Sequence, residues 1–183
     1  MADIFFNLNF FLENYENFEH RYCHFVEDDN FVFPASLDEI NNTMQNNSSI
    51  DGMIGKAFLH DKFGSILNHY NLPYLNYDDP FERLLKYNKV GGLTYYTVFR
   101  TEKFMFICNK VKKLKDDNLC EVLFNYIAAL TMNIVKCQSV FLAREYPRPK
   151  VYNIPSAEDW ITSKFITNSI KNFIDIYTDL CIK

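Results

Sequence analysis

Apolar residues recur every three or four positions over several stretches of the chain, which is the period of an α-helix. In the segment 3–26, the residues with this spacing are Leu8, Phe11, Leu12, Tyr15, Phe18, Tyr22 and Phe25. The segment 52–70 repeats the spacing with Met53, Ala57, Phe58, Phe63, Ile66, Leu67 and Tyr70. Both segments are therefore predicted to be amphipathic helices.

Helix-start signals predict two further helices in the first half of the chain. Pro34 and Ser36 precede two acidic residues, with Ser36 as the candidate N-cap. Asp79 and Pro80 predict a helix over 80–88, in which Phe81, Leu84 and Leu85 share one face. The polar tract 41–50 between these signals is predicted to be a mobile loop.

The second half of the chain is predicted to hold the most apolar helices. Asp116 and Asp117 open the segment 119–142, which is apolar nearly all round and typical of a central helix. Two prolines predict an extended connector over 144–155. Ser156 and Asp159 then form a capping pattern at the start of a final helix. That helix carries Trp160, Ile161, Phe165, Ile166, Ile170, Phe173, Ile174 and Tyr177.

The glycine pair Gly91-Gly92 leads into an apolar run rich in aromatic residues, Leu93 to Val111. Its length favours a buried helix, although its β-branched and aromatic residues also fit a strand pair. Taken with the other segments, the chain is predicted to be an all-α, single-domain helical bundle over 1–183 with a central apolar helical hairpin. The alternative is an α+β fold with a short hairpin at 93–108.

Composition supports a globular protein and places it inside the cell. The 183 residues are 48% hydrophobic and 17% aromatic, which suits one domain with a core filled by rings. The five cysteines are odd in number and form no C-x-x-C pair, which favours a reducing compartment. We find no leader pattern in residues 1–9 and no run long enough to span a membrane. A cytoplasmic location is expected.

Charge and motifs argue against nucleotides and nucleic acids. The net charge of −4 divides into −8 over residues 1–50 (nine acidic residues, one arginine) and +4 over 51–183 (18 basic, 14 acidic). The lysines at 110–115 are closed by two aspartates, so a nucleic-acid partner has little electrostatic support. The chain has five glycines and no phosphate-binding loop motif. No cofactor is expected.

Two clusters are candidates for chemical sites. His20, Cys23 and His24 share one face if the segment is helical, and could present three metal ligands, but no fourth ligand follows at the usual spacing. His60, Asp61 and Ser65 could act as base, orienting group and nucleophile, but the chain has no G-x-S-x-G elbow. Surface helix faces explain both better. We therefore predict no metal site, no catalytic residues and no enzyme.

Several segments together resemble the Bcl (B-cell lymphoma two) family of apoptosis regulators. The segment 3–18 is similar to that family's first helix, and 57–67 to its helix that carries a leucine and, further on, an aspartate. The segment 89–99 is similar to its Asn-Trp-Gly-Arg motif and following helix, with Gly91 on the motif glycine. The segment 158–165 is similar to its tryptophan-led motif. However, Val90 replaces the motif tryptophan, and Gly92 replaces the arginine that pairs with the ligand.

The resemblance implies a surface groove that accepts an amphipathic helix of a pro-apoptotic partner. Lys89 or Arg100 could replace the missing arginine. The lining residues expected for this partner-binding groove are Phe63, Leu67, Leu84, Val90, Gly91, Gly92, Leu93, Tyr96 and Arg100. The chain's richness in Asn, Ile, Phe, Tyr and Lys indicates an AT-rich genome, for which a virus is one source, and the protein would then be a viral inhibitor of host cell death.

Two other functions stay open at this point. The acidic first 50 residues could cover the basic active site of a toxin or nuclease, which would make the chain an immunity or inhibitor protein. The face with His20, Cys23 and His24 could belong to an enzyme. The glycine pair decides the main hypothesis, since it indicates close approach by a partner helix, or packing or a turn within this chain.

Overall fold

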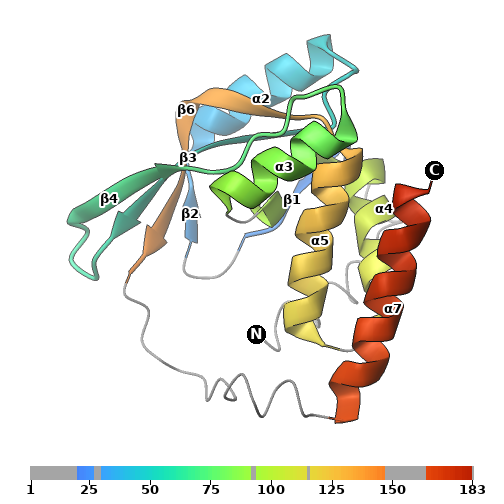
Figure 1. Ribbon diagram of the computed structural model, residues 1–183. Coiled ribbons are helices and arrows are strands. Elements are labelled where there is room, and N and C mark those ends of the chain that lie inside the picture. The colour runs from blue at the N-terminus through green and yellow to red at the C-terminus, as the bar shows by residue number, and fades with distance from the viewer. Residues whose placement is uncertain (1–19, 27–29, 92–93, 115, 147–163, 183) are drawn as a thin grey trace.

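The computed structural model describes residues 20–26, 30–91, 94–114, 116–146 and 164–182. These residues form one mixed β-sheet with helices packed against it and beside it (Figure 1). The fold is therefore mixed α/β. The prediction of an all-α helical bundle with a central apolar helical hairpin is wrong.

The sheet contains one parallel pair at its centre. The described strands are β1 (Tyr22–His24), β2 (Asn30–Val32), β3 (Gly52–His60), β4 (Ile66–Asn71), β5 (Val98–Arg100) and β6 (Ile134–Glu145). Their order is β1-β5-β3-β6-β2, and β4 pairs with the far half of β3, beyond the part that pairs with β5. β3 and β6 run parallel, and the other neighbours are antiparallel.

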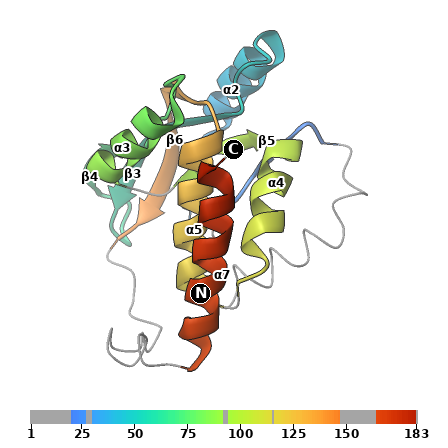
Figure 2. The ribbon, with the colours of Figure 1, turned by 45° about the vertical axis from the view of Figure 1, so that its right-hand side comes forward.

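Five helices are described, and three of them lie side by side. The helices are α2 (Pro34–Asn46), α3 (Pro80–Val90), α4 (Thr101–Val111), α5 (Asp117–Thr131) and α7 (Lys164–Cys181), with a 3-10 turn η2 (Thr94–Tyr96). Both ribbon views place α4, α5 and α7 next to one another, with α5 in contact with the other two (Figure 1 and Figure 2). α3 also packs on α5, and α2 packs on β6 and β3. The helices thus bury their apolar faces against one another and against the sheet.

The segment 52–70 forms strands β3 and β4, not a helix. β3 lies between β6 on one side and β4 and β5 on the other, and Ile54 and Ala57 have no exposed surface. A strand buried on both faces shows no alternation of apolar and polar residues. Apolar residues on both faces of β3 therefore produce a spacing that resembles that of a helix.

The two apolar segments of the predicted helical hairpin each change structure partway. After the glycine pair, η2 and β5 precede α4, and β5 pairs with β1 and β3 rather than within the segment 93–108. The predicted helix 119–142 ends at Thr131, and β6 begins at Ile134. The short hairpin at 93–108 is therefore also absent from the described part of that segment.

Three smaller predictions also change. Of the predicted first helix, residues 3–19 lie outside the described residues, and Tyr22–His24 form strand β1. The polar tract 41–50 is helical up to Asn46, as the second half of α2. In the predicted connector 144–155, residues 144 and 145 end β6, and residues 147–155 lie outside the described residues.

The predicted N-cap Ser36 is wrong, because α2 begins at Pro34 after the N-cap Phe33, and the Ser36 hydroxyl donates to the oxygen of Phe33. Two other helix-start signals are confirmed. Asp79 caps α3, because its side chain accepts a hydrogen bond of 2.7 Å from the backbone N–H of Phe81. Asp116 caps α5 in the same way, through a 2.9 Å bond from the N–H of Leu119. The final helix is present over the described residues of α7. These short-range signals act within one turn of helix, so the sequence shows them directly.

Aromatic rings join the sheet to the helices. Phe99 of β5, Phe104 of α4 and Phe124 of α5 contact one another, with ring centroids 5.7 to 6.0 Å apart. Phe99 has no exposed surface, and the other two are buried. Such pairs add to the stabilisation that comes from burial alone. This ring cluster holds α4 and α5 on the sheet.

Candidate functional site

The turn between β3 and β4 is built around Asp61. Its side chain accepts hydrogen bonds from the backbone N–H groups of Phe63 (2.9 Å) and Ser65 (2.8 Å). The N–H bond from Ser65, followed by that from Phe63, holds the pKa of the Asp61 carboxyl below its usual value. Gly64 has φ +82°, a conformation that favours glycine. The turn is therefore strongly specified by its own residues.

This hairpin carries large apolar side chains into solvent. Phe63 is 81% exposed, Ile66 64% and Leu67 51%. Residues 62–69 are all exposed, and the hairpin projects from the end of the sheet (Figure 1). Single exposed apolar residues are ordinary, but three within five positions on a projecting arm indicate an interaction surface. We refer to residues 61–71 as the hairpin arm.

The outer edge of β4 offers backbone groups for hydrogen bonding. Among the described strands, β4 pairs with β3 alone. The N–H of Leu72 bonds to the oxygen of Gly55 on β3 at 3.3 Å, so the backbone groups of Leu72 face β3. In an antiparallel pair the backbone groups of successive residues point alternately toward the partner strand and away from it. Those of Tyr70 therefore face β3, and those of His69 and Asn71 face outward. In agreement, the N–H of His69 donates to the side chain of its own neighbour, Asn68, at 2.8 Å.

The edge lacks the usual protection by charge. Edge strands commonly carry a charged residue, often lysine, or a proline, and either one blocks pairing with a further strand. Residues 63–71 contain no Asp, Glu, Lys, Arg or Pro. One protective feature is present, since Leu67 is an extra residue of β4 at a register shift opposite Leu59 and His60. The bulge leaves the stretch from Asn68 to Asn71 in regular register with β3.

The base of the hairpin arm is fixed to the sheet. The N–H of Tyr146 bonds to the oxygen of His60 at 2.7 Å, immediately before the turn. β6 pairs with β3 as far as the register pair of His60 and Glu145. The arm is thus a projection from a well-paired strand, and its edge is held in place.

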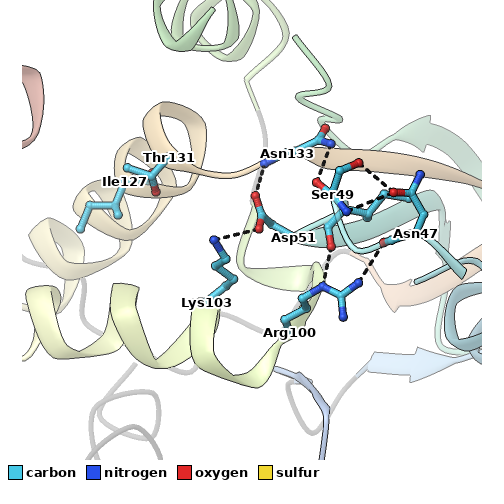
Figure 3. Close-up of polar contacts among 9 residues, drawn as sticks. Asn47, Ser49, Asp51, Arg100, Lys103, Ile127, Thr131 and Asn133 are labelled. Atoms are coloured by element: carbon cyan, nitrogen blue, oxygen red, sulfur yellow. Dashed lines mark hydrogen bonds and ion pairs between the residues drawn. The ribbon is translucent and has the colours of Figure 1, made fainter. Parts of the chain in front are cut away.

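A polar network secures the opposite end of β3 (Figure 3). Asp51 forms an ion pair with Lys103 of α4, with Nζ 3.0 Å from Oδ1. Its other oxygen accepts a 2.8 Å hydrogen bond from the N–H of Asn133, and the Asn133 side chain donates to the oxygen of Ser49. These contacts link the starts of β3, α4 and β6. All of these contacts are made between groups of this chain, so we assign them a structural role.

Arg100 belongs to the same network and binds this chain's own backbone. Its Nε donates to the oxygen of Ile50 at 2.8 Å, and its Nη2 donates to the oxygens of Met44 and Asn47 at 2.7 and 2.9 Å. The last carbonyls of a helix lack intrahelical partners, and Met44 lies in the last turn of α2. Arg100 therefore secures the end of α2.

The structure distributes the predicted groove residues over separate places. Phe63 and Leu67 lie on the hairpin arm, and Val90 is exposed at the end of α3. Leu84 is partly buried against the core, and Tyr96 has no exposed surface. Gly92 and Leu93 lie outside the described residues. Only Phe63 and Leu67 are brought together on one surface.

Gly91 has a backbone reason for being glycine. It follows the last residue of α3 with φ +66°, and its N–H bonds to the oxygen of Tyr87 at 2.7 Å. A Cβ added there would meet nothing within 4 Å. The close approaches occur instead in β3, where a Cβ on Gly55 would lie 2.5 Å from the sulfur of Cys137. Gly91 thus ends a helix, and Gly55 permits tight packing.

The two clusters weighed as chemical sites take other roles. Cys23 and His24 lie on strand β1 rather than a helix, so their i, i+3, i+4 spacing with His20 does not define one face. Among the described residues, no group of three or more His, Cys, Asp or Glu side chains could hold a metal ion. Asp61 and Ser65 form the turn of the hairpin arm, and His60 is the last residue of β3 before it. Burial raises the pKa of the Cys23 thiol to about 12 and that of Cys137 to about 11.

His24 lies in a polar group on the inner side of the sheet. Its ring contacts Phe141 of β6 edge-on, with centroids 5.1 Å apart, and its Nδ1 lies 3.4 Å from the oxygen of Thr97. Burial lowers the pKa of His24 to about 4, so its ring is neutral at physiological pH. On the other side of the group, the Asn30 side chain of β2 donates to the Tyr96 hydroxyl at 3.5 Å. These contacts join β1 to β6, and β2 to the segment before β5.

Sequence reasoning missed Ile66 and the edge of β4 as elements of the candidate site. The signal available in the sequence was the uncharged stretch 63–71 with adjacent apolar residues. The helical spacing of the same residues predicts a helix there, and a helix has no strand edge.

The comparisons give no relative from which to transfer a function. No known family model matches the chain, and no curated protein matches it. Among the described helices, none combines the length and apolar character needed to cross a membrane.

Proposed function

We propose that this protein is a non-enzymatic protein-binding module whose contact surface is the hairpin arm. The observation that carries the proposal is the combination, in one projecting hairpin, of three exposed apolar side chains with an uncharged strand edge. Phe63, Ile66 and Leu67 supply apolar area, and β4 supplies outward backbone groups at His69 and Asn71. A partner segment in extended conformation can add to such an edge as a further strand.

The binding energy in this proposal comes from two sources. Strand addition supplies backbone hydrogen bonds, each worth about 0.5–1.5 kcal/mol net of the bonds to water that it replaces. Burial of the exposed apolar area adds about 25 cal/mol per Å². The bonds fix the alignment of the partner strand, and the apolar side chains select its sequence.

The family resemblance and this proposal agree that the partner is a protein. The proposal does not keep the groove for a helix that the resemblance implies. Tyr96 is buried and Arg100 is bonded to its own backbone, so neither offers a surface to a ligand helix. The apoptotic and inhibitory roles rest on the resemblance alone, and the viral source rests on amino-acid composition alone. Most acidic residues of the first 50 lie outside the described residues, so the toxin-inhibitor alternative also has no geometric argument. A reducing location such as the cytoplasm suits the proposal, because all five cysteines are free thiols.

Proline and alanine substitutions at His69 test the proposal. Proline removes the outward N–H of an edge strand without breaking a bond to β3, whereas alanine keeps that N–H. The measurement is cross-linking in the protein's native cells, from a photoreactive residue placed at Phe63. We expect a discrete protein adduct from the otherwise native chain and from His69→Ala, and none from His69→Pro.

The control places the photoreactive residue at Phe106, an exposed aromatic on α4. Adducts that form equally from both positions, or that survive the proline, would contradict the proposal. Calorimetry with amphipathic helical peptides tests the helix-groove competitor. Tight binding that is unaffected by His69→Pro would favour that competitor over the hairpin arm.

A further inference from the structure

We infer that the strand which adds to β4 is the β4 strand of a second copy of this chain, paired antiparallel across a two-fold axis. This inference rests on the proposed function, because it uses the same edge. It names the partner and the alignment of the two strands.

The first argument is the symmetry of the exposed groups. An antiparallel edge presents each outward residue with both a donor and an acceptor, so two identical edges related by a two-fold axis are self-complementary. With Tyr70 at the axis, the outward residue His69 lies opposite Asn71 of the other copy. By symmetry there are two such pairs of His69 and Asn71, and within each pair the two residues exchange two backbone N–H···O hydrogen bonds. This alignment uses the regular part of β4 and leaves the bulge at Leu67 outside it.

The second argument is charge. Like charges placed directly opposite one another destabilise a strand pair. The stretch 63–71 carries no formal charge at neutral pH, so self-pairing places no like charges together. A basic or acidic partner strand, by contrast, would find no complementary charge on this stretch. The edge of β4 therefore suits an uncharged partner strand, and β4 of a second copy of the chain is such a strand.

The third argument is that the other described edge strands, β1 and β2, are short and have side chains that contact residues within the fold. The curl of the sheet sets His24 of β1 against Phe141 of β6, 5.1 Å between ring centroids. It also sets Asn30 of β2 within hydrogen-bonding distance of Tyr96, beside β5. Each of these edge strands has three residues, whereas β4 has six. Of the described edges, β4 is the long one that points away from the body of the fold (Figure 1).

The contact is small, so the dimer is expected to be weak. Interfaces of less than about 1,200 Å² in total are typical of transient association. We expect the measured mass to rise from 21.7 kDa toward twice that value as the concentration increases through the micromolar range.

Sedimentation velocity from about 1 to 200 µM is the first test. The native chain and His69→Ala should self-associate, and His69→Pro should weaken the association at least tenfold. Equal circular dichroism and unfolding midpoints show that the proline variant is folded. Equal association of the native chain and His69→Pro overturns the inference, and so does a native chain that stays monomeric throughout.

Disulfide trapping tests the alignment without relying on the proline. In a Cys181→Ser background, which removes the exposed thiol, Tyr70→Cys places two cysteines at the axis. Their Cα atoms would lie about 4.5 Å apart, within disulfide range. At 3.4 Å per residue, two cysteines from Ile66→Cys would lie roughly 27 Å apart. Cross-linking at 70 but not at 66 is expected, and the reverse pattern overturns the alignment.

The results separate this inference from the proposed function. A monomeric native chain with no cross-link at 70 refutes the dimer. If a different protein still cross-links to Phe63 in a manner that His69→Pro abolishes, the protein-binding proposal stands. If neither partner is found, both fall.

Discussion

Asp51 and Lys103 form an ion pair at the junction of sheet and helix, with Nζ and Oδ1 3.0 Å apart (Figure 3). The two residues are unequally placed, since Lys103 is 39% exposed and Asp51 only 15%. Asp51 also accepts the N–H of Asn133, whereas no further contact of the Lys103 side chain is described. The carboxylate therefore matters more to the fold than the ammonium group does.

This inequality gives a prediction about stability. Asp51→Ala leaves the partly buried N–H of Asn133 without its acceptor and should lower the free energy of unfolding by about 1–2 kcal/mol. Lys103→Ala removes only a partly exposed ion pair and should lower it by less than about 1 kcal/mol. Urea unfolding of the two variants measures both values. Equal losses would show that the ion pair, and not the backbone contact, carries the effect.

Arg83 is predicted to be essential to the junction of α3 and α5. It is 8% exposed, and its guanidinium donates to the oxygens of Ala129 (3.0 Å) and Leu130 (2.7 Å) near the end of α5. It also donates to the oxygens of Tyr77 and Asp78 before α3. An ammonium group cannot reproduce this planar set of donors. Arg83→Lys should therefore cost about 2–3 kcal/mol in urea unfolding.

The control for Arg83 is Lys89→Arg, an exchange of the same two residue types at an exposed position of the same helix. It should change the stability by less than about 0.5 kcal/mol. A similarly small loss for Arg83→Lys would mean that the carbonyl oxygens find water instead.

His24 predicts a loss of stability in acid. Its folded pKa of about 4, lowered by burial, is below the unfolded value of 6.5. The unfolded chain therefore binds more protons between these values, so the contribution is complete above pH 6.5 and is lost as the pH falls toward 4. Between pH 7 and 4.5, the native chain should lose about 2–3 kcal/mol more than His24→Gln.

The matched control is His69→Gln, because His69 is exposed on the hairpin arm. Chemical unfolding at several pH values measures the three chains. If His24→Gln and His69→Gln change the pH dependence equally, burial of His24 is not the cause.

Gly91 offers a direct test of its two explanations. Gly91 combines φ +66° with ψ −166°, a backbone conformation that is essentially restricted to glycine, so any side chain there is strained by about 1–3 kcal/mol. Gly91→Ala and Gly91→Asn should therefore destabilise the chain by similar amounts. If a packed neighbour were the reason for the glycine, the larger asparagine would be the worse substitution. Thermal unfolding distinguishes the two outcomes.

Local signals predicted the fold correctly where one turn of helix decides the structure. Asp79 with Pro80, and Asp116, cap α3 and α5 as expected, because capping needs only residues two or three positions apart. The sheet could not be predicted in this way. β3 pairs with β6, so that Met53 lies beside Val135, more than 80 positions along the chain. A single sequence does not display such long-range pairs.

The end of α5 shows how an apolar run conceals a change of structure. The helix stops at Thr131 and β6 starts at Ile134, with no glycine or proline between them. Asn133 makes the break by bonding to Asp51 and Ser49, which are distant in sequence. In the candidate site, Phe63 and Leu67 were predicted as contact residues and lie on one exposed arm. Their strand edge could not be predicted once the segment was assigned to a helix.

Amide hydrogen exchange over 66–71 tests the central claim, that the outer edge of β4 is the contact surface, most directly. Exchange is compared between dilute protein and protein saturated with its binding partner, including its own copies at high concentration. We predict that the outward amides of His69 and Asn71 slow on association, while those of Asn68 and Tyr70, which face β3, change little. Unchanged exchange at His69 and Asn71, with slowing elsewhere in the chain, would contradict the account.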